Sequence, residues 1–378
     1  MMLLDHFADL DDPRSGNATR HKLADILAVA LCATLAGADG FADMERFGTA
    51  KRAWFERWLD LPGGIPSHDT FGRVFAALDA ERFAACFAAW TRSVAEVTDG
   101  EVVALDGKTV RGSASADGRA LQVVSAWATQ NRLVLAHMPV PEHSNEAATL
   151  PAVLALLDVR GCLVTIDAAG CYPETAQRVL DGSADYVLAL KANQPTLHDE
   201  VASLFERAGN ESERDLRRAL RPLTGYAEHT DGGHGRVEIR RCHALDVAET
   251  GLIDAPAWPG LRSVAMVESE RHVSGGDTVS VERRYYVSSL PVDAERVLAA
   301  VRSHWGIENG QHWVLDVVFS EDLSAIRHRV AATNAATLRR LALGVLSDDT
   351  LRDSLRGKRQ RAGWDEEYLA RLIGLQMR

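Results

Sequence analysis

The stretch VVALDGKT, residues 102–109, decides the fold of this chain. Its first four residues are all apolar, which is typical of a short strand buried on both faces of a sheet. The run ends in Asp106, and a carboxylate beside a buried strand is costly unless it is solvated, caps a turn or binds a cation. The stretch therefore predicts a sheet and, where the apolar run ends, a candidate site.

A second stretch repeats this arrangement, because CLVTIDAAG, residues 162–170, is an apolar run that leads directly to Asp167. The segments around these two stretches predict, in chain order, a hairpin at 122–128 and 132–137, helices at 147–157 and 173–180, and a third buried strand at 185–190. This order of strands and helices indicates an α/β fold, in which a mixed sheet carries helices on its faces.

The pattern changes several times along the chain and predicts five ranges. Residues 1–98 are helical in pattern, and Ser67 begins a helix-start signal. A compact helical unit of this kind serves DNA binding, oligomerisation or simple capping of the structure, and the pattern leaves all three open. The other four predicted ranges are an α/β part at 99–200, a β-rich insertion at 201–290, a second part of the core at 291–346 and a basic C-terminal tail at 347–378.

Composition describes an ordinary globular protein of 378 residues, with 46% hydrophobic and 25% charged residues. The net charge of −11 argues mildly against a nucleic-acid partner, although the basic run RGKRQR, residues 356–361, and the arginines near residue 240 are local exceptions. Five cysteines without metal-ligand spacing predict buried, reduced thiols and no zinc site. The apolar stretch at residues 26–36 is shorter than the roughly 20 residues of a membrane span, so we expect a cytoplasmic protein without a membrane partner.

The two isolated aspartates suit metal chemistry if a third carboxylate joins them. Asp106 and Asp167 on neighbouring strands would be ligands for Mg²⁺, a hard cation that prefers oxygen, and a pair of such ions performs phosphodiester chemistry. Glu308, in the stretch HWGIEN at residues 304–309, is the candidate for the third position. Turn-capping aspartates and a solvated helix glutamate explain the same residues. Asp316, Glu321 and Asp322 are alternative carboxylates at the third position.

Seven motifs, which follow one another over nearly the whole chain, give further evidence on the function of these carboxylates. They are LDGKTVRGS (105–113), HSNE (143–146), TIDAAGC (165–171), YVLALKANQ (186–194), GHGR (233–236), YYVSSL (285–290) and HWGIEN (304–309). In these motifs the chain resembles bacterial insertion-sequence DDE transposases, and most closely the subgroup that includes the H-repeat-associated proteins. Two departures, Tyr172-Pro173 and Ala192, leave the carboxylates intact.

The resemblance implies a ribonuclease-H-like catalytic core, a helical N-terminal transposase-associated domain and a β-rich insertion. It assigns the catalytic and metal-binding triad to Asp106, Asp167 and Glu308, which would hold two Mg²⁺ or Mn²⁺ ions. Its partner would be double-stranded DNA, at the element ends and at the target. The protein would act as a homodimer or larger assembly and would associate with the nucleoid when bound to DNA.

Five further residues are candidates for DNA contacts, most with a simpler alternative. Lys108 and Arg111 follow the first aspartate, and solvated surface charge explains both equally well. Lys191 ends the third buried strand and is a candidate for a phosphate contact. His234 and Arg236 would position the insertion on DNA, and the neighbouring glycines offer turn formation as the alternative.

Four side chains close to Glu308 are expected to have structural roles. Trp305 and Trp313 are expected to lie in the core. His304 and His312 are expected to support the site rather than to ligate metal.

These observations predict a transposase that binds the terminal inverted repeats of its own element, cleaves phosphodiester bonds with metal ions and transfers the freed strand to target DNA. Three alternatives stay open. They are a catalytically idle or repurposed DNA-binding protein of the same fold, a nuclease that cuts RNA–DNA hybrids without joining strands, and a cytosolic scaffold without metal-dependent activity.

Overall fold

The structure is a computed structural model of the chain. It describes residues 3–14, 20–95, 98–114, 118–210, 224–233, 236–252, 257–273 and 279–375. The chain divides into two compact units, each assembled from separate segments. Unit 1 contains Met1–Glu96, Gly107–Asn145 and Glu308–Arg378, and unit 2 contains Val97–Asp106 and Glu146–Ile307. These units cut across the five predicted ranges, because the helical residues 1–98 belong almost entirely to the same unit as the C-terminal residues.

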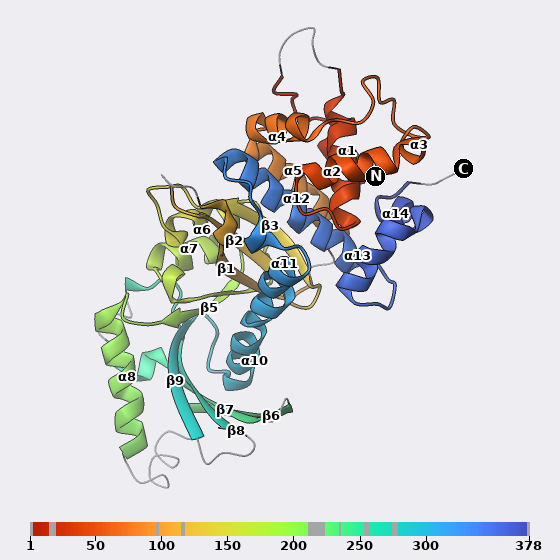
Figure 1. Cartoon of the computed structure of the whole chain (residues 1–378). Helices are drawn as coiled ribbons and strands as arrows, with labels where there is room; N and C mark the ends of the chain where they lie inside the picture. The colour runs from red at the N-terminus through yellow and green to blue at the C-terminus, as the bar shows by residue number, and fades with distance from the viewer. Residues whose placement is uncertain are drawn as a thin grey trace. The chain divides into compact units, whose positions relative to one another are not determined.

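Strands and helices follow one another as the apolar patterns predict (Figure 1). Unit 1 contains the helices α1 (Leu23–Leu35), α2 (Phe41–Ala50), α3 (Arg52–Phe55), α4 (His68–Ala77), α5 (Ala80–Val94), α11 (Trp313–Val317), α12 (Arg329–Asp348), α13 (Leu355–Trp364) and α14 (Glu366–Leu372), with strands β2 (Leu121–Ala128) and β3 (Leu133–Pro139). Unit 2 contains β4 (Leu163–Ile166), β5 (Asp185–Leu190), β6 (Thr224–Gly233), β7 (Arg236–Asp246), β8 (Ser263–Val273) and β9 (Val279–Ser288), with helices α6 (Glu146–Ala155), α7 (Pro173–Asp181), α8 (Pro195–Asn210) and α10 (Ala294–His304). Strand β1 (Val102–Val110) begins in unit 2 and ends in unit 1.

The nine strands of the described chain form one mixed sheet in the order β3-β2-β1-β4-β5-β9-β8-β7-β6. Strands β1, β4 and β5 run parallel, and β6 to β9 form antiparallel ladders. The predicted fold class is confirmed: a ribonuclease-H-like mixed-sheet core with a helical N-terminal region and a β-rich insertion.

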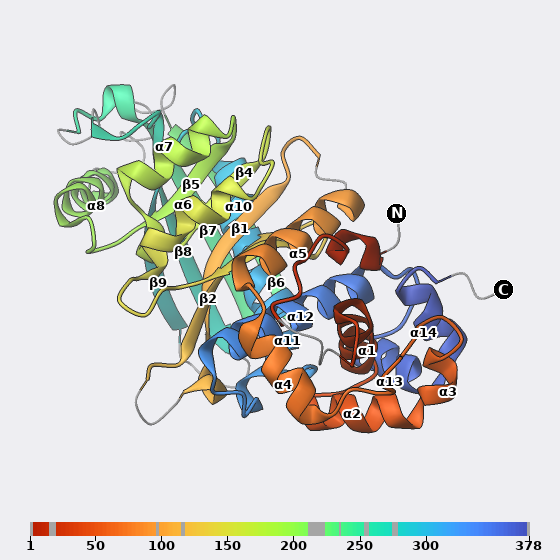
Figure 2. The same ribbon diagram turned by 90° about the horizontal axis from the view of Figure 1, so that it is seen from above.

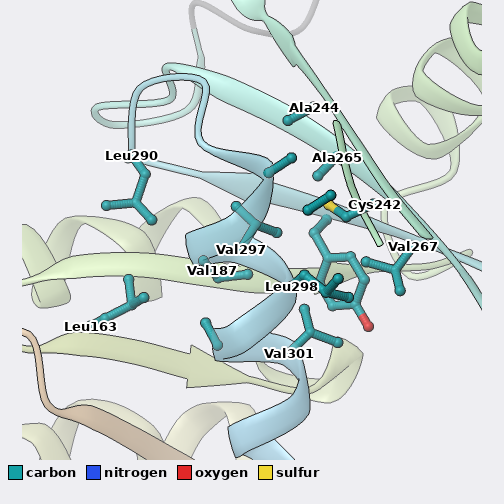
Figure 3. Packing of buried hydrophobic residues seen from close by; sticks show 14 of the residues in the cluster. Leu163, Val187, Cys242, Ala244, Ala265, Val267, Leu290, Val297, Leu298 and Val301 are labelled. Carbon is teal, nitrogen blue, oxygen red and sulfur yellow. The ribbon is translucent and has the colours of Figure 1, made fainter. Parts of the chain in front are cut away.

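The core of unit 2 lies between α10 and the sheet. Val297, Leu298 and Val301 of α10 pack against Cys242, Val267 and other apolar residues of the strands (Figure 3). Because side chains alternate across a strand, this packing uses every second residue of β7, β8 and β9. The same alternation carries the remaining residues to the other face of the sheet.

The core of unit 1 is organised around α12, which packs against α1, α4, α5 and β3 (Figure 1 and Figure 2). Gly344 allows one close approach, because a Cβ atom there would lie 2.9 Å from the ring of Trp90. The predicted helix start at Ser67 is confirmed, since its side chain accepts a hydrogen bond from the backbone N–H of Thr70.

None of the described helices is both long and apolar enough to span a lipid bilayer. All five cysteines are free thiols.

The basic run near the C-terminus is helical and packs against other helices of unit 1. It forms α13, in which Lys358 and Arg359 are buried. The Lys358 ammonium donates to the carbonyl oxygens of Leu346 and Asp349 at 2.9 and 2.6 Å, and the Arg359 guanidinium donates to those of Thr34 and others. The last carbonyls of a helix have no partner within the helix, and basic side chains satisfy them. Here they serve the ends of α12 and α1.

Candidate active site

Asp106 and Asp167 occupy equivalent positions on neighbouring parallel strands of unit 2. Leu105 of β1 is paired with Ile166, the last residue of β4. Asp106 is the next residue of β1, and Asp167 is the first residue after β4. Neighbouring strands lie about 4.8 Å apart, so the register brings the two backbones together as the sequence predicts. Both side chains are partly buried. One sheet register therefore presents two carboxylates at the same level of the sheet.

Asp167 also caps a turn, which is the simpler alternative considered for it. Its Oδ1 accepts a hydrogen bond of 3.0 Å from the backbone N–H of Ala169, at the start of the 3₁₀ turn Ala168–Gly170. A carboxylate has two oxygens with about four lone-pair positions, so this bond uses only part of its acceptor capacity. Capping and ligand binding are therefore compatible at Asp167.

His304 ties the end of α10 to β4 within unit 2. Its Nδ1 lies 3.0 Å from the hydroxyl of Thr165, two residues before Asp167. Burial lowers the pKa of His304 to about 4, although the Asp167 carboxylate acts in the opposite direction. The ring is therefore neutral at pH 7, and it holds the last turn of α10 beside the strand that carries the second aspartate.

Glu308 follows His304 by only four residues. Ile307, the last residue of unit 2 in this part of the chain, is fully buried. Four residues of chain span at most about 14 Å even when fully extended. Covalent connection alone therefore keeps the Cα atom of Glu308 within that distance of the Cα atom of His304.

Glu308 begins a π-helical turn, Glu308–His312, in unit 1. Its side chain is 52% exposed, and Oε2 lies 3.8 Å from Nδ1 of the buried His312. Single π-helical turns are frequent at functional sites, because the extra residue redirects side chains. Gly310 lets this turn pack closely in unit 1, since a Cβ atom there would lie 2.6 Å from the ring of Trp127.

Lys108 is buried and paired, although it was predicted as a candidate DNA contact. Its side chain is 6% exposed, and Nζ lies 2.7 Å from Asp316 and 3.4 Å from Asp322. The backbone N–H of Arg111 also donates to Asp322 at 3.0 Å. These contacts, all within unit 1, join the end of β1 to the segment that follows Glu308. Asp316 and Asp322, considered above as alternative third carboxylates, pair with Lys108 instead.

Glu321, the remaining alternative carboxylate, is fully buried against Arg340. Their atoms lie 2.9 Å apart, and both side chains are 0% exposed. Arg340 also donates to the carbonyl of Ala336 and to the hydroxyl of Ser125. The sequence did not predict this pair, because no local pattern indicates that a residue of α12 contacts one in the short turn Glu321–Leu323.

The other predicted DNA contacts lie on the surface where the structure describes them. Arg111, Lys191 and Arg236 are exposed, and His234 lies outside the described residues. Lys191 directly follows β5, as predicted.

The prediction that Trp305 and Trp313 lie in the core is wrong, because they are 44% and 57% exposed. Trp305 instead lies against the guanidinium of Arg284, at 4.7 Å from the ring centroid. This contact explains how a large ring is held at the surface without core packing.

Comparison with known proteins agrees with the motifs. Residues 98–344 match the family model described as "Transposase DDE domain", and residues 4–91 match the one described as "DDE_Tnp_1-associated". The chain is 34% identical over 377 residues to the protein named "H repeat-associated putative transposase YhhI" of Escherichia coli strain K12, covering 98% of this chain and 97% of that protein. It is also 42% identical over 292 residues to an uncharacterized protein from the dhlA 3′ region of Xanthobacter autotrophicus, covering 76% and 94%.

Two further similarities are more limited. A protein named "Inactive transposase YbfQ" of Escherichia coli strain K12 is 39% identical over 72 residues, which cover 19% of this chain and 86% of that protein. A chain of a piggyBac transposase synaptic complex with hairpin DNA matches with a TM-score of 0.44 and 9% identity, over 99% of this chain and 78% of that chain. The two matched family models cover most of the chain, and the carboxylates lie within the second of them. The chain therefore belongs to the DDE transposase family.

Proposed function

We propose that the protein is a DNA transposase that binds the terminal inverted repeats of its element, cleaves phosphodiester bonds and transfers the freed strand to target DNA. The observation that carries the proposal is the register of β1 and β4, which brings Asp106 and Asp167 to equivalent positions on neighbouring strands. Family membership supports the transposase class. We propose Asp106, Asp167 and Glu308 as the catalytic carboxylates.

The donor set fits divalent metal ions. Carboxylate oxygens are the ligands that Mg²⁺ prefers, and Mn²⁺ accepts the same ligands. His312, in contact with Glu308, is a further candidate donor. When bound, a pair of such ions would supply Lewis-acid stabilisation and an activated water or hydroxyl.

The residues around the carboxylates would position them. His304 holds the end of α10 against β4, and Lys108 ties the end of β1 to the helix that follows Glu308. His304 lies in the segment that leads to Glu308, and Lys108 lies in the segment that follows Asp106. We propose that the protein acts on double-stranded DNA, as a homodimer or larger assembly, at the nucleoid of the cell.

A cleavage assay with matched variants tests the proposal. The substrate is a labelled duplex made from the DNA that flanks the gene, incubated with the full chain and Mg²⁺. Asp106→Asn, Asp167→Asn and Glu308→Gln should each lower the cleavage rate at least about a thousandfold, because each removes a charged ligand from a preorganised site. Glu174→Gln, which changes an exposed carboxylate on α7 of unit 2, should leave the rate unchanged.

Strand cleavage in Mg²⁺ by Asp106→Asn or Asp167→Asn at the wild-type rate would refute the mechanism. If the wild-type chain binds the duplex but neither cuts nor joins it, the repurposed DNA-binding protein becomes the better assignment. Hydrolysis of RNA–DNA hybrids without strand transfer would point to a nuclease instead.

A further inference from the structure

One face of the β7–β9 ladder changes character along its length within unit 2. Near β5, this face contributes Cys242, Ala265 and Tyr286 to the apolar core under α10. Arg240, two residues before Cys242 in β7, points to the same face because side chains alternate, and it is opposite Ser269 of β8. The face that is apolar under α10 therefore becomes strongly charged beyond the core.

A hollow of about 460 Å³ opens on this charged part of the face. Its lining includes five arginines, which come from all three strands and from α10: Arg236, Arg240, Arg271, Arg284 and Arg302. We call this feature the arginine hollow. All of its residues belong to unit 2.

The arginine hollow is positive although the whole chain is acidic. Its five arginines are accompanied by two glutamates in the lining, Glu238 and Glu282. Asp231 of β6 also pairs with Arg240 at 2.8 Å and with Arg302 at 2.7 Å, so these groups together carry a net charge of +2 in a chain of net charge −11. The glutamates orient the guanidinium groups: Glu238 pairs with Arg240 at 2.7 Å and with Arg271 at 3.2 Å. These pairs hold the arginines in place, and because the arginines outnumber the acidic groups, a net positive charge remains.

The opposite face of the same strands lacks this excess. There, Arg241 and Arg283 meet three glutamates, Glu228, Glu268 and Glu270, at 2.7–3.3 Å. The described ion pairs on that face therefore leave it with one more negative than positive charge. Positive charge is concentrated on the face that is hollowed.

Trp305 adds a flat apolar surface to the arginine hollow. The indole is 44% exposed and lies against Arg284. Guanidinium groups bind phosphate oxygens in a bidentate manner, and exposed aromatic rings accept nucleobases and sugars. From Arg236 to Arg240 the strand extends about 13 Å, which matches about four nucleotides at 3.4 Å each along one strand of a duplex.

We propose that the arginine hollow binds the phosphate backbone of a DNA strand. This inference rests on the proposed function and deepens it, because it assigns the DNA contact to one face of the β-rich insertion. A strand with one phosphate for each nucleotide matches the spread of the arginines, and the exposed ring of Trp305 offers an apolar surface beside them. The hollow would position DNA through its backbone and would not read its sequence.

Binding measurements with variants of the full chain test the assignment. Arg236→Ala and Arg271→Ala should each weaken binding of a fluorescent duplex by roughly 5–10-fold near 0.1 M salt, because each removes about one phosphate contact. Each should also reduce the salt slope of the logarithm of affinity by about 1. Glu282→Gln, which removes an acidic group from the lining, should tighten binding. Binding is measured in EDTA, so that metal-dependent cleavage does not contribute.

Arg283→Ala is the matched control, since it removes an arginine from the opposite face of β9. It should change affinity less than twofold, and thermal melting should show that all four variants fold. Wild-type affinity and salt slope in both hollow variants, while the wild-type chain still cleaves the duplex, would overturn this inference and leave the proposed function standing. If the wild-type chain neither cleaves nor binds the duplex, both this inference and the proposed function are overturned.

Discussion

Lys108 illustrates how a side chain's surroundings decide its role. Its position two residues after Asp106 is compatible with a phosphate contact, and nothing in the local sequence indicates that Asp316 and Asp322 are its partners. In the structure it is almost fully buried and paired with Asp316 and Asp322, which lie more than two hundred residues farther along the chain. A buried ammonium must be paired, so its electrostatic role is internal.

Replacing Lys108 by Met should therefore affect stability more than DNA affinity. The change leaves two neighbouring carboxylates without their cation, and we expect the free energy of unfolding to fall by about 2–4 kcal/mol. Urea unfolding measures this, and the double variant Lys108→Met/Asp316→Asn should recover part of the loss. A reduced salt slope for DNA binding at unchanged stability would instead support a phosphate contact.

His137 should make stability depend on pH. It is buried, its Nε2 lies 2.9 Å from the hydroxyl of Thr337, and burial holds its pKa well below the ordinary value of 6.5. The folded protein therefore keeps it neutral, whereas the unfolded chain takes up a proton below about pH 6.5. Since the unfolded state binds more protons there, stability is full above that pH and falls as the pH decreases, by up to about 1.4 kcal/mol per pH unit.

The difference between the wild-type chain and His137→Gln isolates this contribution. Urea unfolding midpoints are measured at about pH 7.5, 6.5 and 5.5. The decrease in the midpoint from pH 7.5 to pH 5.5 should be smaller in the variant than in the wild type. His304 contributes in the same direction in both proteins, because its pKa is also lowered. His272→Gln, at a partly exposed position on β8, is the control. Identical pH dependence in all three proteins would contradict the assignment.

Among the elements, the π-helical turn Glu308–His312 was the least predictable. The stretch HWGIENGQHW has the composition of an ordinary amphipathic helix, and nothing local marks the extra residue in the turn. Its geometry depends on tertiary contact, because Gly310 packs against Trp127 of β2, in the same unit. By contrast, the buried strands β1, β4 and β5 were predictable, since continuous apolar runs need sheet neighbours on both sides.

Gly310→Ala should disturb this turn. A Cβ atom there would lie 2.6 Å from the Trp127 ring, and overpacking of this kind costs about 1–3 kcal/mol. Because the turn carries Glu308, we also expect slower DNA cleavage with unchanged DNA affinity. Gly306→Ala is the matched control, as a Cβ atom at Gly306 would meet nothing within 4 Å. Equal cleavage rates and melting temperatures for the two variants would refute this account.

At the scale of the whole molecule, two of the three proposed carboxylates, Asp106 and Glu308, are at points where the chain passes from one unit to the other. Asp106 is the last residue of one segment of unit 2, and Glu308 is the first residue of one segment of unit 1. A ligand that binds the folded chain and not the unfolded chain stabilises it by mass action. Metal binding at these residues is therefore measurable without catalysis.

Mg²⁺ should raise the melting temperature of the wild-type chain. At a concentration ten times the dissociation constant, the gain is about 1.4 kcal/mol, and EDTA should remove it. The gain should be absent in Asp106→Asn and Glu308→Gln, and retained in Glu174→Gln. An equal gain in all four proteins would mean that the ion binds elsewhere.

By itself, the sequence determined the α/β class, the buried strands and the two aspartates that follow them, because these depend on local patterns and on the cost of a carboxylate beside an apolar run. The family motifs added Glu308. Only the tertiary structure decided that Lys108 pairs with both Asp316 and Asp322, and that Glu321 pairs with Arg340. It alone also decided that Lys358 and Arg359 of the basic run are buried, and that five arginines share one hollow. The physical reason is that charge pairing depends on distance in space, and residues far apart in the chain carry no local sign of the partner they will meet.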